Sequence, residues 1–114
     1  MTEHTPHAPQ LPADPAAVIA WFEAHGDISA ERCSDCHCPL AQYLSAHGSQ
    51  YVRIGCGLYL TGHDRPWRGM PNWAEIFVAE VDRDANEGDK VSLAEAAATL
   101  RTIAQQRDSA EVGG

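Results

Sequence analysis

The strongest helix signal in the chain reads SLAEAAATLRTI over residues 92–103. Ser92 and Glu95 stand three residues apart and make a capping box, in which each side chain accepts a hydrogen bond from the backbone N–H of the other. Apolar residues then recur at helical spacing, at Leu93, Ala96, Ala97, Leu100 and Ile103. The pattern predicts an amphipathic helix that begins at Ser92 and ends near Gln106.

Three more amphipathic helices are expected upstream, over residues 14–25, 39–47 and 72–85. Pro15 and Pro39 fall at first helical positions, where the missing N–H costs nothing, and Asp14 is a favourable N-cap. Gly26 favours a left-handed C-cap, and Gly48 ends the second helix. The predicted inner faces are Val18, Trp21, Phe22 and His25; Leu40, Tyr43, Leu44 and His47; and Trp73, Ile76, Phe77 and Val81.

Between the second and third helices the pattern changes to residues that favour strands. Residues 51–54 and 58–61 are rich in β-branched and aromatic side chains, and Gly55-Cys56-Gly57 joins them. This indicates a β-hairpin with a three-residue turn, with one bent strand as the alternative. Residues 62–71 are rich in Gly and Pro and are expected to form an exposed loop.

The expected fold class is α-dominated α+β, with four amphipathic helices and one short β-hairpin between the second and the third. A chain of 114 residues has room for one small domain, which we place at residues 14–106. Residues 1–13, with Pro6, Pro9 and Pro12, are expected to be a flexible lead-in without core contacts. Residues 107–114 are expected to be a disordered tail.

Composition narrows the range of partners. Sixteen acidic residues against eight basic ones leave a formal charge of -8, which disfavours direct binding to nucleic acid and favours a protein partner with a basic surface. No apolar stretch approaches the roughly 20 residues that span a bilayer, and no export signal is recognised. We therefore expect a cytoplasmic monomer or dimer that does not enter membranes.

The cysteines are the sharpest chemical feature. Cys33-Ser34-Asp35-Cys36-His37-Cys38 places three thiols within six residues, and a CxxC turn can chelate one metal ion. We predict a structural zinc site, which would join this loop to the hairpin turn. Its ligands are Cys33, Cys36, Cys38 and Cys56, with His37 or His63 as substitutes for one thiolate. The alternative is four reduced thiols, some of them buried as small apolar side chains.

The same residues allow two redox interpretations. Cys33-x-x-Cys36-His37 matches the attachment pattern of c-type haem, with Met70 as a distal ligand. A thiol-disulfide role is the other: Cys38 stands at a helix N-terminus, where the dipole stabilises a thiolate, and Cys36 would be its disulfide partner. Beyond these, the chain has no GxSxG elbow, phosphate-binding glycine loop or HExxH motif, so we expect no enzyme of those classes.

Two charged segments are candidate partner-binding surfaces. Acidic residues crowd the third helix and its exit, at Glu75, Glu80, Asp82, Asp84 and Glu87. They suit docking to a basic groove, or else form a solvated face that keeps the protein soluble. Arg65, Trp67 and Arg68 form a cationic and aromatic segment that is typical of a contact hot spot, unless Trp67 anchors the loop instead.

Three sequence segments resemble small helical proteins of actinobacteria and their phages. They are Cys38-Pro39-Leu40-Ala41-Gln42-Tyr43-Leu44, Pro71-Asn72-Trp73 and Phe77-Val78-Ala79-Glu80-Val81-Asp82. The resemblance implies an accessory protein of a phage or mobile element. Taken with the composition, it favours a small acidic non-enzymatic module that binds or inhibits a host protein and is stabilised by zinc.

Overall fold

The computed structural model describes residues 10–34, 36–48, 51–55, 57–62 and 67–113, with the side chains of the last segment described to residue 106. Its helices are α1 (Ala16–Ala24), α2 (Pro39–Ala46), α3 (Asn72–Asp82) and α4 (Leu93–Gly113). Its strands are β1 (Ser29–Glu31), β2 (Arg53–Ile54), β3 (Leu58–Leu60), β4 (Arg68–Gly69) and β5 (Lys90–Ser92). The class is α+β, with helix outweighing strand, as expected.

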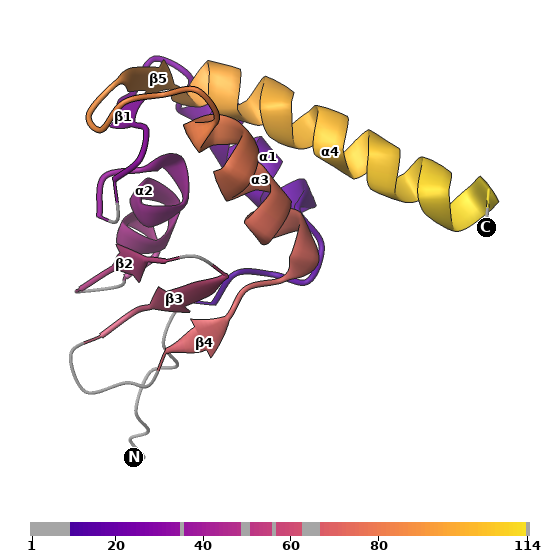
Figure 1. Ribbon diagram of the computed structural model, residues 1–114, viewed down its shortest axis with the longest axis horizontal. Helices are drawn as coiled ribbons and strands as arrows, with labels where there is room; N and C mark the ends of the chain where they lie inside the picture. The colour runs from indigo at the N-terminus through magenta and orange to yellow at the C-terminus, as the bar shows by residue number, and fades with distance from the viewer. Residues whose placement is uncertain (1–9, 35, 49–50, 56, 63–66, 114) are drawn as a thin grey trace.

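The long helix α4 packs on both α1 and α3 and joins them in one helical layer (Figure 1). All five residues of its predicted apolar stripe are buried. Phe22 of α1 and Phe77 of α3 stack beneath it with ring centroids 5.8 Å apart. Arg101 of α4 and Glu23 of α1 form an ion pair at the rim. The core of the domain therefore begins where these three helices meet and continues under α2 and the three-stranded sheet, which contribute Leu40, Leu44 and Tyr59.

The predicted capping box is confirmed at the start of α4. The Ser92 N–H donates to Glu95 Oε1 over 3.1 Å, and the Glu95 N–H donates to Ser92 Oγ over 3.1 Å. The predicted end near Gln106 is wrong, because the helix continues to Gly113. Ala, Glu and Gln residues favour helix intrinsically, so the backbone stays helical after the apolar stripe stops at Ile103.

The start of α1 is also as expected, since the Ala16 N–H donates to Asp14 Oδ1 over 2.8 Å. The predicted left-handed C-cap is wrong: Gly26 does not have a positive φ. A Cβ atom at Gly26 would lie 3.2 Å from the Cβ of Ala94, so glycine here allows α1 and α4 to approach closely.

The lead-in makes core contacts in its described part, contrary to expectation. Leu11 is buried, and its N–H donates to the hydroxyl of Tyr59 over 3.1 Å. Trp73 Nε1 donates to the carbonyl of Pro12 over 2.9 Å. Buried polar groups of the sheet and of α3 thus find partners in residues 11 and 12, which attach this segment to the domain.

Helix α2 buries Leu40, Tyr43 and Leu44 as predicted, but His47 is exposed. The His47 ring stacks at a tilt on Tyr43, with centroids 4.2 Å apart, and its Nδ1 lies 2.7 Å from the Tyr43 carbonyl. Gly48 ends the helix with a φ of 106°, the left-handed conformation that favours glycine.

Helix α3 is shorter than predicted, and one of the residues on its buried face differs from the prediction. It ends at Asp82 because Arg83 is extended and Asp84 has a φ of 56°. Ile76, expected on the inner face, is 40% exposed, whereas Ala74 is fully buried. Ile76 instead lines an open hollow between α3 and α4 with Thr99 and Ile103.

The strands are not limited to one hairpin between the second and third helices. The hairpin is present, with Arg53 opposite Leu60 and Ile54 opposite Tyr59, but β4 adds a third antiparallel strand from the expected loop. A separate antiparallel pair joins β1, before α2, to β5, after α3. Strands of two or three residues are too short to show a period of two, so sequence periodicity does not reveal them.

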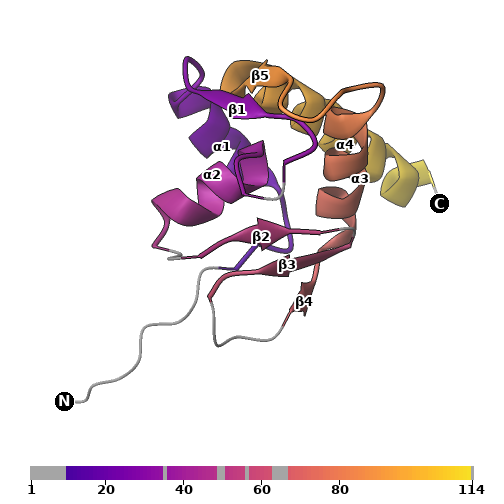
Figure 2. The ribbon, with the colours of Figure 1, turned by 60° about the vertical axis from the view of Figure 1, so that its left-hand side comes forward.

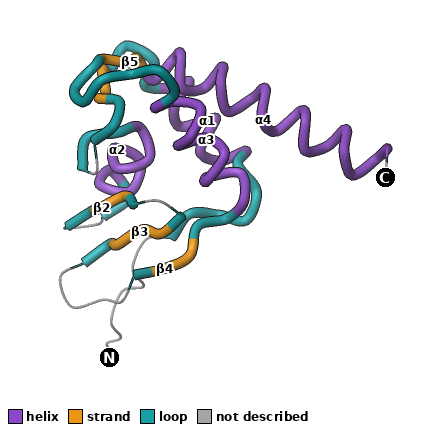
Figure 3. Tube along the Cα trace, in the orientation of Figure 1, coloured by secondary structure: helices purple, strands orange, loops and turns teal. Residues whose placement is uncertain are grey.

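The two sheets lie on different sides of the helices. The three-stranded sheet is at one end of the molecule, and the β1–β5 pair closes the opposite end beside the start of α4 (Figures 1 and 2). In the tube view, α2 and α3 stand between the two sheets (Figure 3). The connection from β1 to α2, which carries Cys33, Cys36 and Cys38 and is called the cysteine loop below, lies in this middle region.

Candidate functional site

Three parts of the chain enclose a half-open groove of about 680 Å³. They are the cysteine loop together with the start of α2, the β2–β3 turn, and α3. Its floor is apolar and consists of Leu40, Ile54, Phe77, Val78 and Val81. Cys33 and Cys38 line one wall, and the backbone of Gly55 and Gly57 lines the other. Concave apolar surfaces with a few polar groups are the usual form of a binding site.

Two carboxylates of α3 border this floor. Glu75, in the first turn of the helix, is exposed, and a Cβ atom at Gly57 would lie 3.5 Å from its Oε1. Asp82, at the last position, is half-buried, and its Oδ1 accepts the Cys33 N–H over 2.7 Å. Both belong to the predicted acidic surface, so the structure brings two of its members to one groove.

Cys33 is held by the end of α3. Its backbone has a φ of 56°, and its thiol donates weakly to the carbonyls of Ala85, at 3.5 Å, and Asp82, at 3.8 Å. Desolvation raises the pKa of this thiol, and the carboxylate of Asp82 raises it further. Cys33 is therefore a protonated hydrogen-bond donor rather than a ready nucleophile.

Cys38 is the N-cap residue of α2 and is almost fully buried. Burial raises its pKa to about 12 against an ordinary value of 9.0, while hydrogen bonds from the backbone of Ala41 and Leu40 act in the opposite direction. The expectation that the helix N-terminus activates this thiol is wrong, because desolvation outweighs the stabilisation that the helix offers.

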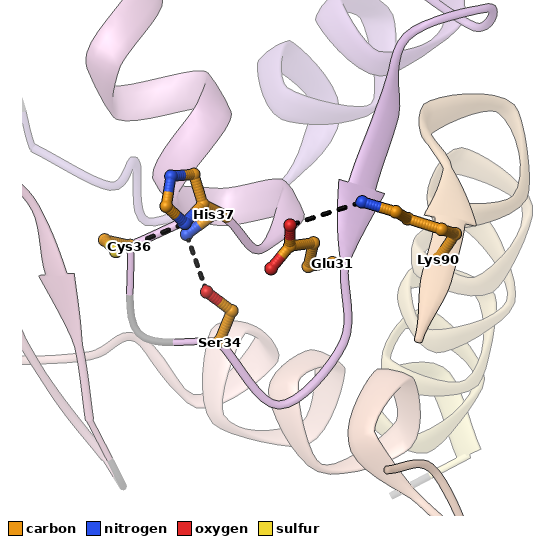
Figure 4. A network of polar contacts seen from close by, with 5 residues as sticks. All are labelled: Glu31, Ser34, Cys36, His37 and Lys90. Atoms are coloured by element: carbon orange, nitrogen blue, oxygen red, sulfur yellow. Dashed lines mark hydrogen bonds and ion pairs between the residues drawn. The ribbon is translucent and has the colours of Figure 1, made fainter. Parts of the chain in front are cut away.

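Cys36 is the most accessible of the three described cysteines. Its Sγ lies 3.3 Å from Nδ1 of His37, and the two side chains meet above the loop (Figure 4). The loop is tied at both sides, since the His37 N–H donates to Ser34 Oγ over 3.0 Å and the Glu31 N–H donates to the His37 carbonyl over 2.9 Å. Lys90 pairs with Glu31 at 3.2 Å across the β1–β5 ladder.

The predicted zinc ligands are only partly described. Cys33 and Cys38 line the groove and Cys36 does not; Cys56 and His63 lie outside the described residues. Within the part of the chain that the structure describes, no three His, Cys, Asp or Glu side chains gather in a way that would hold a metal ion. Zinc binding stays a prediction from the cysteine spacing.

The residues of the haem interpretation are placed differently from that expectation. Met70 is buried in the hydrophobic core, and its N–H donates to the Gly57 carbonyl over 2.9 Å. Cys33 points its thiol at backbone carbonyls. In this conformation neither the methionine nor that cysteine is presented to a haem.

The remaining acidic residues do not form one continuous face with the groove. Glu80 borders a second hollow of about 400 Å³ between α3 and α4, where it pairs with Arg83 at 3.5 Å. Asp84 and Glu87 are exposed in the connection from α3 to β5. The expected acidic surface is thus divided among the groove, this hollow and the connection.

The predicted cationic and aromatic segment lies on the sheet. Trp67 is 50% exposed, and its ring lies 3.4 Å from where a Cβ atom at Gly55 would be. Arg68 is half-buried in β4, and Arg65 lies outside the described residues. Leu58, 45% exposed on β3, is a large apolar residue that the sequence did not single out. Trp67 therefore lies against the β2–β3 turn and leaves about half of its surface exposed.

Sequence reasoning also missed Val78 and Ala79, which line the groove. In the sequence, these two residues are ordinary positions of a predicted helix. They become part of a concave site only because the cysteine loop and the β2–β3 turn approach α3. No sequence signal identifies them without the tertiary arrangement.

The fold and the site together define an acidic α+β domain with an apolar groove. Comparison with known proteins found no matching family model, curated protein or solved structure. The resemblance to actinobacterial and phage proteins stays a prediction. Among the helices as described, none combines the length and the apolar character that crossing a membrane requires.

Proposed function

We propose that this chain is a protein-binding module whose groove takes an apolar segment of a partner with a basic surface. The observation that carries the proposal is the groove itself, because its apolar floor is bordered by Glu75 and Asp82. Apolar contact supplies affinity, and the carboxylates favour cationic neighbours over acidic ones. A formal charge of -8 works in the same direction at longer range.

The proposal is tested by panning a random-peptide phage library against the immobilised protein. We expect the enriched peptides to combine apolar residues with Lys or Arg. Ala79→Trp places a bulky neutral ring on an exposed position of the groove wall and should weaken binding of these peptides at least tenfold.

The matched control is Ala98→Trp, the same change at an exposed position of α4 away from the groove. It should bind the peptides as the unmodified protein does. Circular dichroism establishes that both variants are folded. A library without enrichment, or peptides that bind Ala79→Trp at full strength, would reject the groove as the binding site.

Thiol-disulfide exchange is a second candidate, favoured by the 3.3 Å contact between Cys36 Sγ and His37 Nδ1. A neutral imidazole at this distance can accept a hydrogen bond from the thiol and hold its sulfur in a fixed position. Mass-mapped alkylation at neutral pH should label Cys36 before Cys33 and Cys38, and His37→Ala should slow that labelling. Equal rates in the two proteins would remove this candidate.

The roles as a zinc-stabilised protein, as an inhibitor of a host protein and as a phage accessory protein stay predictions. These predictions concern the stability of the module and the identity of its partner. The proposal above concerns the surface on which the partner binds.

A further inference from the structure

The two carboxylates beside the groove suggest a spacing rule for its ligand. Resting on the proposed function, we infer that the groove selects an extended peptide segment with two cationic side chains about 10 Å apart and apolar residues between them. The spacing follows from α3: Glu75 and Asp82 are seven residues apart, and a helix rises about 1.5 Å per residue.

Both carboxylates are open to a new partner. Among the described residues, the carboxylate of Glu75 has no hydrogen bond or ion pair. Asp82 uses Oδ1 for the Cys33 N–H, which leaves Oδ2 for a ligand. The nearby Arg32 donates from Nη1 to the Val81 carbonyl over 2.7 Å and does not pair with Asp82. Within the described part of the chain, no ion pair neutralises the negative charge of either carboxylate.

The floor between the carboxylates is apolar. Phe77, Val78 and Val81 lie between them along α3, and Leu40 and Ile54 complete the surface. Burying the central side chains of a ligand here carries a small desolvation penalty, because the groove presents few polar groups that would lose their bound water. Cations on both sides then meet a carboxylate without leaving the solvent-exposed rim.

An extended segment fits these dimensions. In an extended polyproline II segment, which has three residues per turn, residues i and i+3 project to the same side and are about 9–10 Å apart, at about 3.1 Å per residue. In a helix the same distance would take about seven residues, at about 1.5 Å per residue, so the two cations would stand at positions i and i+7 instead. The pattern cation-apolar-apolar-cation in extended form therefore matches the distance between the two carboxylates along α3.

The test uses two capped tetrapeptides of identical composition, KLLK and KKLL, titrated into the ¹⁵N-labelled full chain and followed by amide shifts. The peptides have the same charge and the same apolar content, so they differ only in spacing. We expect KLLK to bind about three- to fivefold more tightly than KKLL, the difference that one additional ion pair at a solvated rim provides. Shifts should concentrate at Val78, Gly57 and Cys33.

Glu75→Gln should remove most of the preference for KLLK, and Asp82→Asn, which keeps an oxygen acceptor for the Cys33 N–H, should do the same. Glu80→Gln is the matched control, because it removes one charge from the same helix at a residue that borders the other hollow. It should leave the preference unchanged.

Equal binding of both peptides, with Ala79→Trp weakening both, would overturn the spacing rule and leave the proposed function standing. Binding of neither peptide to a protein that selects library peptides would also overturn the spacing rule. No binding of KLLK together with no enrichment from the library would overturn both.

Discussion

At the scale of single residues, Cys33 and Asp84 are the non-glycine residues that the structure describes with a left-handed backbone, each with a φ of 56°. Such a conformation costs roughly 1–2 kcal/mol for a side chain with a Cβ atom. The bond from the Cys33 N–H to Asp82 offsets part of this cost. The cysteine loop is thus held in its bend by the end of α3.

We expect Cys33→Gly to be more stable than Cys33→Ala by about 0.5–1 kcal/mol, because glycine adopts a positive φ without strain but loses more entropy on folding. Both variants lack the thiol, so the comparison isolates the backbone. Urea unfolding under reducing conditions measures the difference. A less stable glycine variant would show that the left-handed conformation is not strained.

Cys38 predicts a pH dependence of stability. Its pKa is raised from 9.0 to about 12 in the folded protein, so the folded state keeps this proton when the unfolded chain has lost it. The contribution is fully present below about pH 9, and the free energy of unfolding falls by about 1.4 kcal/mol per pH unit as the pH rises from 9 toward 12.

Urea titrations at pH 8, 9 and 10 on the reduced protein measure this slope. Cys38→Ala is the control, because Cys33 and Tyr43, whose pKa values are also raised by desolvation, remain in both proteins. The slope should be shallower in the variant by about 1.4 kcal/mol per pH unit once the pH exceeds 9. Parallel pH profiles would contradict the assignment to Cys38.

At the scale of elements, the start of α4 depends on the side chain of Ser92. We expect Ser92→Ala to lower the free energy of unfolding by about 1 kcal/mol, because the Glu95 N–H loses its acceptor. Ser45→Ala, at an exposed position of α2, is the control and should change stability by less than about 0.5 kcal/mol. If both serines have the same effect in thermal unfolding, the cap is not what starts the helix.

The helices were predictable from sequence because their signals are local. The capping box at Ser92, the proline at position 39 and the apolar stripe of α4 each act within a few residues. The β1–β5 pair was not predictable, because Ala30 and Val91 are joined across 61 positions and neither strand is long enough to alternate. Ile76 was assigned to the wrong face because its environment depends on the neighbouring helix.

The candidate site was predictable only as a set of residue types. The cysteines and acidic residues stood out by composition, but the groove arises where the cysteine loop, the β2–β3 turn and α3 meet. Burial raises the pKa of Cys38 against the expectation, and the carbonyls of Asp82 and Ala85 accept hydrogen bonds from the Cys33 thiol. Neither effect follows from spacing along the chain.

At the scale of the whole molecule, the predicted zinc ion would link the cysteine loop to the sheet end. We expect native mass spectrometry to find one zinc ion per chain that is lost on denaturation, and chelation to lower the midpoint of thermal unfolding. Cys36→Ser should abolish the added mass, while Ser45→Ala should retain it. A native mass equal to that of the chain with four free thiols would end the zinc prediction.

The β1–β5 ladder also has a consequence for synthesis of the chain. The strand of Ala30 has no partner until Val91, 61 residues later, has been synthesised. At about 5–20 residues per second, the ribosome needs roughly 3–12 s to make that stretch. Throughout this interval the apolar face of α1, with Val18 and Phe22, lacks its α4 cover. Until the last helix emerges, this apolar face is a surface that ribosome-associated chaperones can bind.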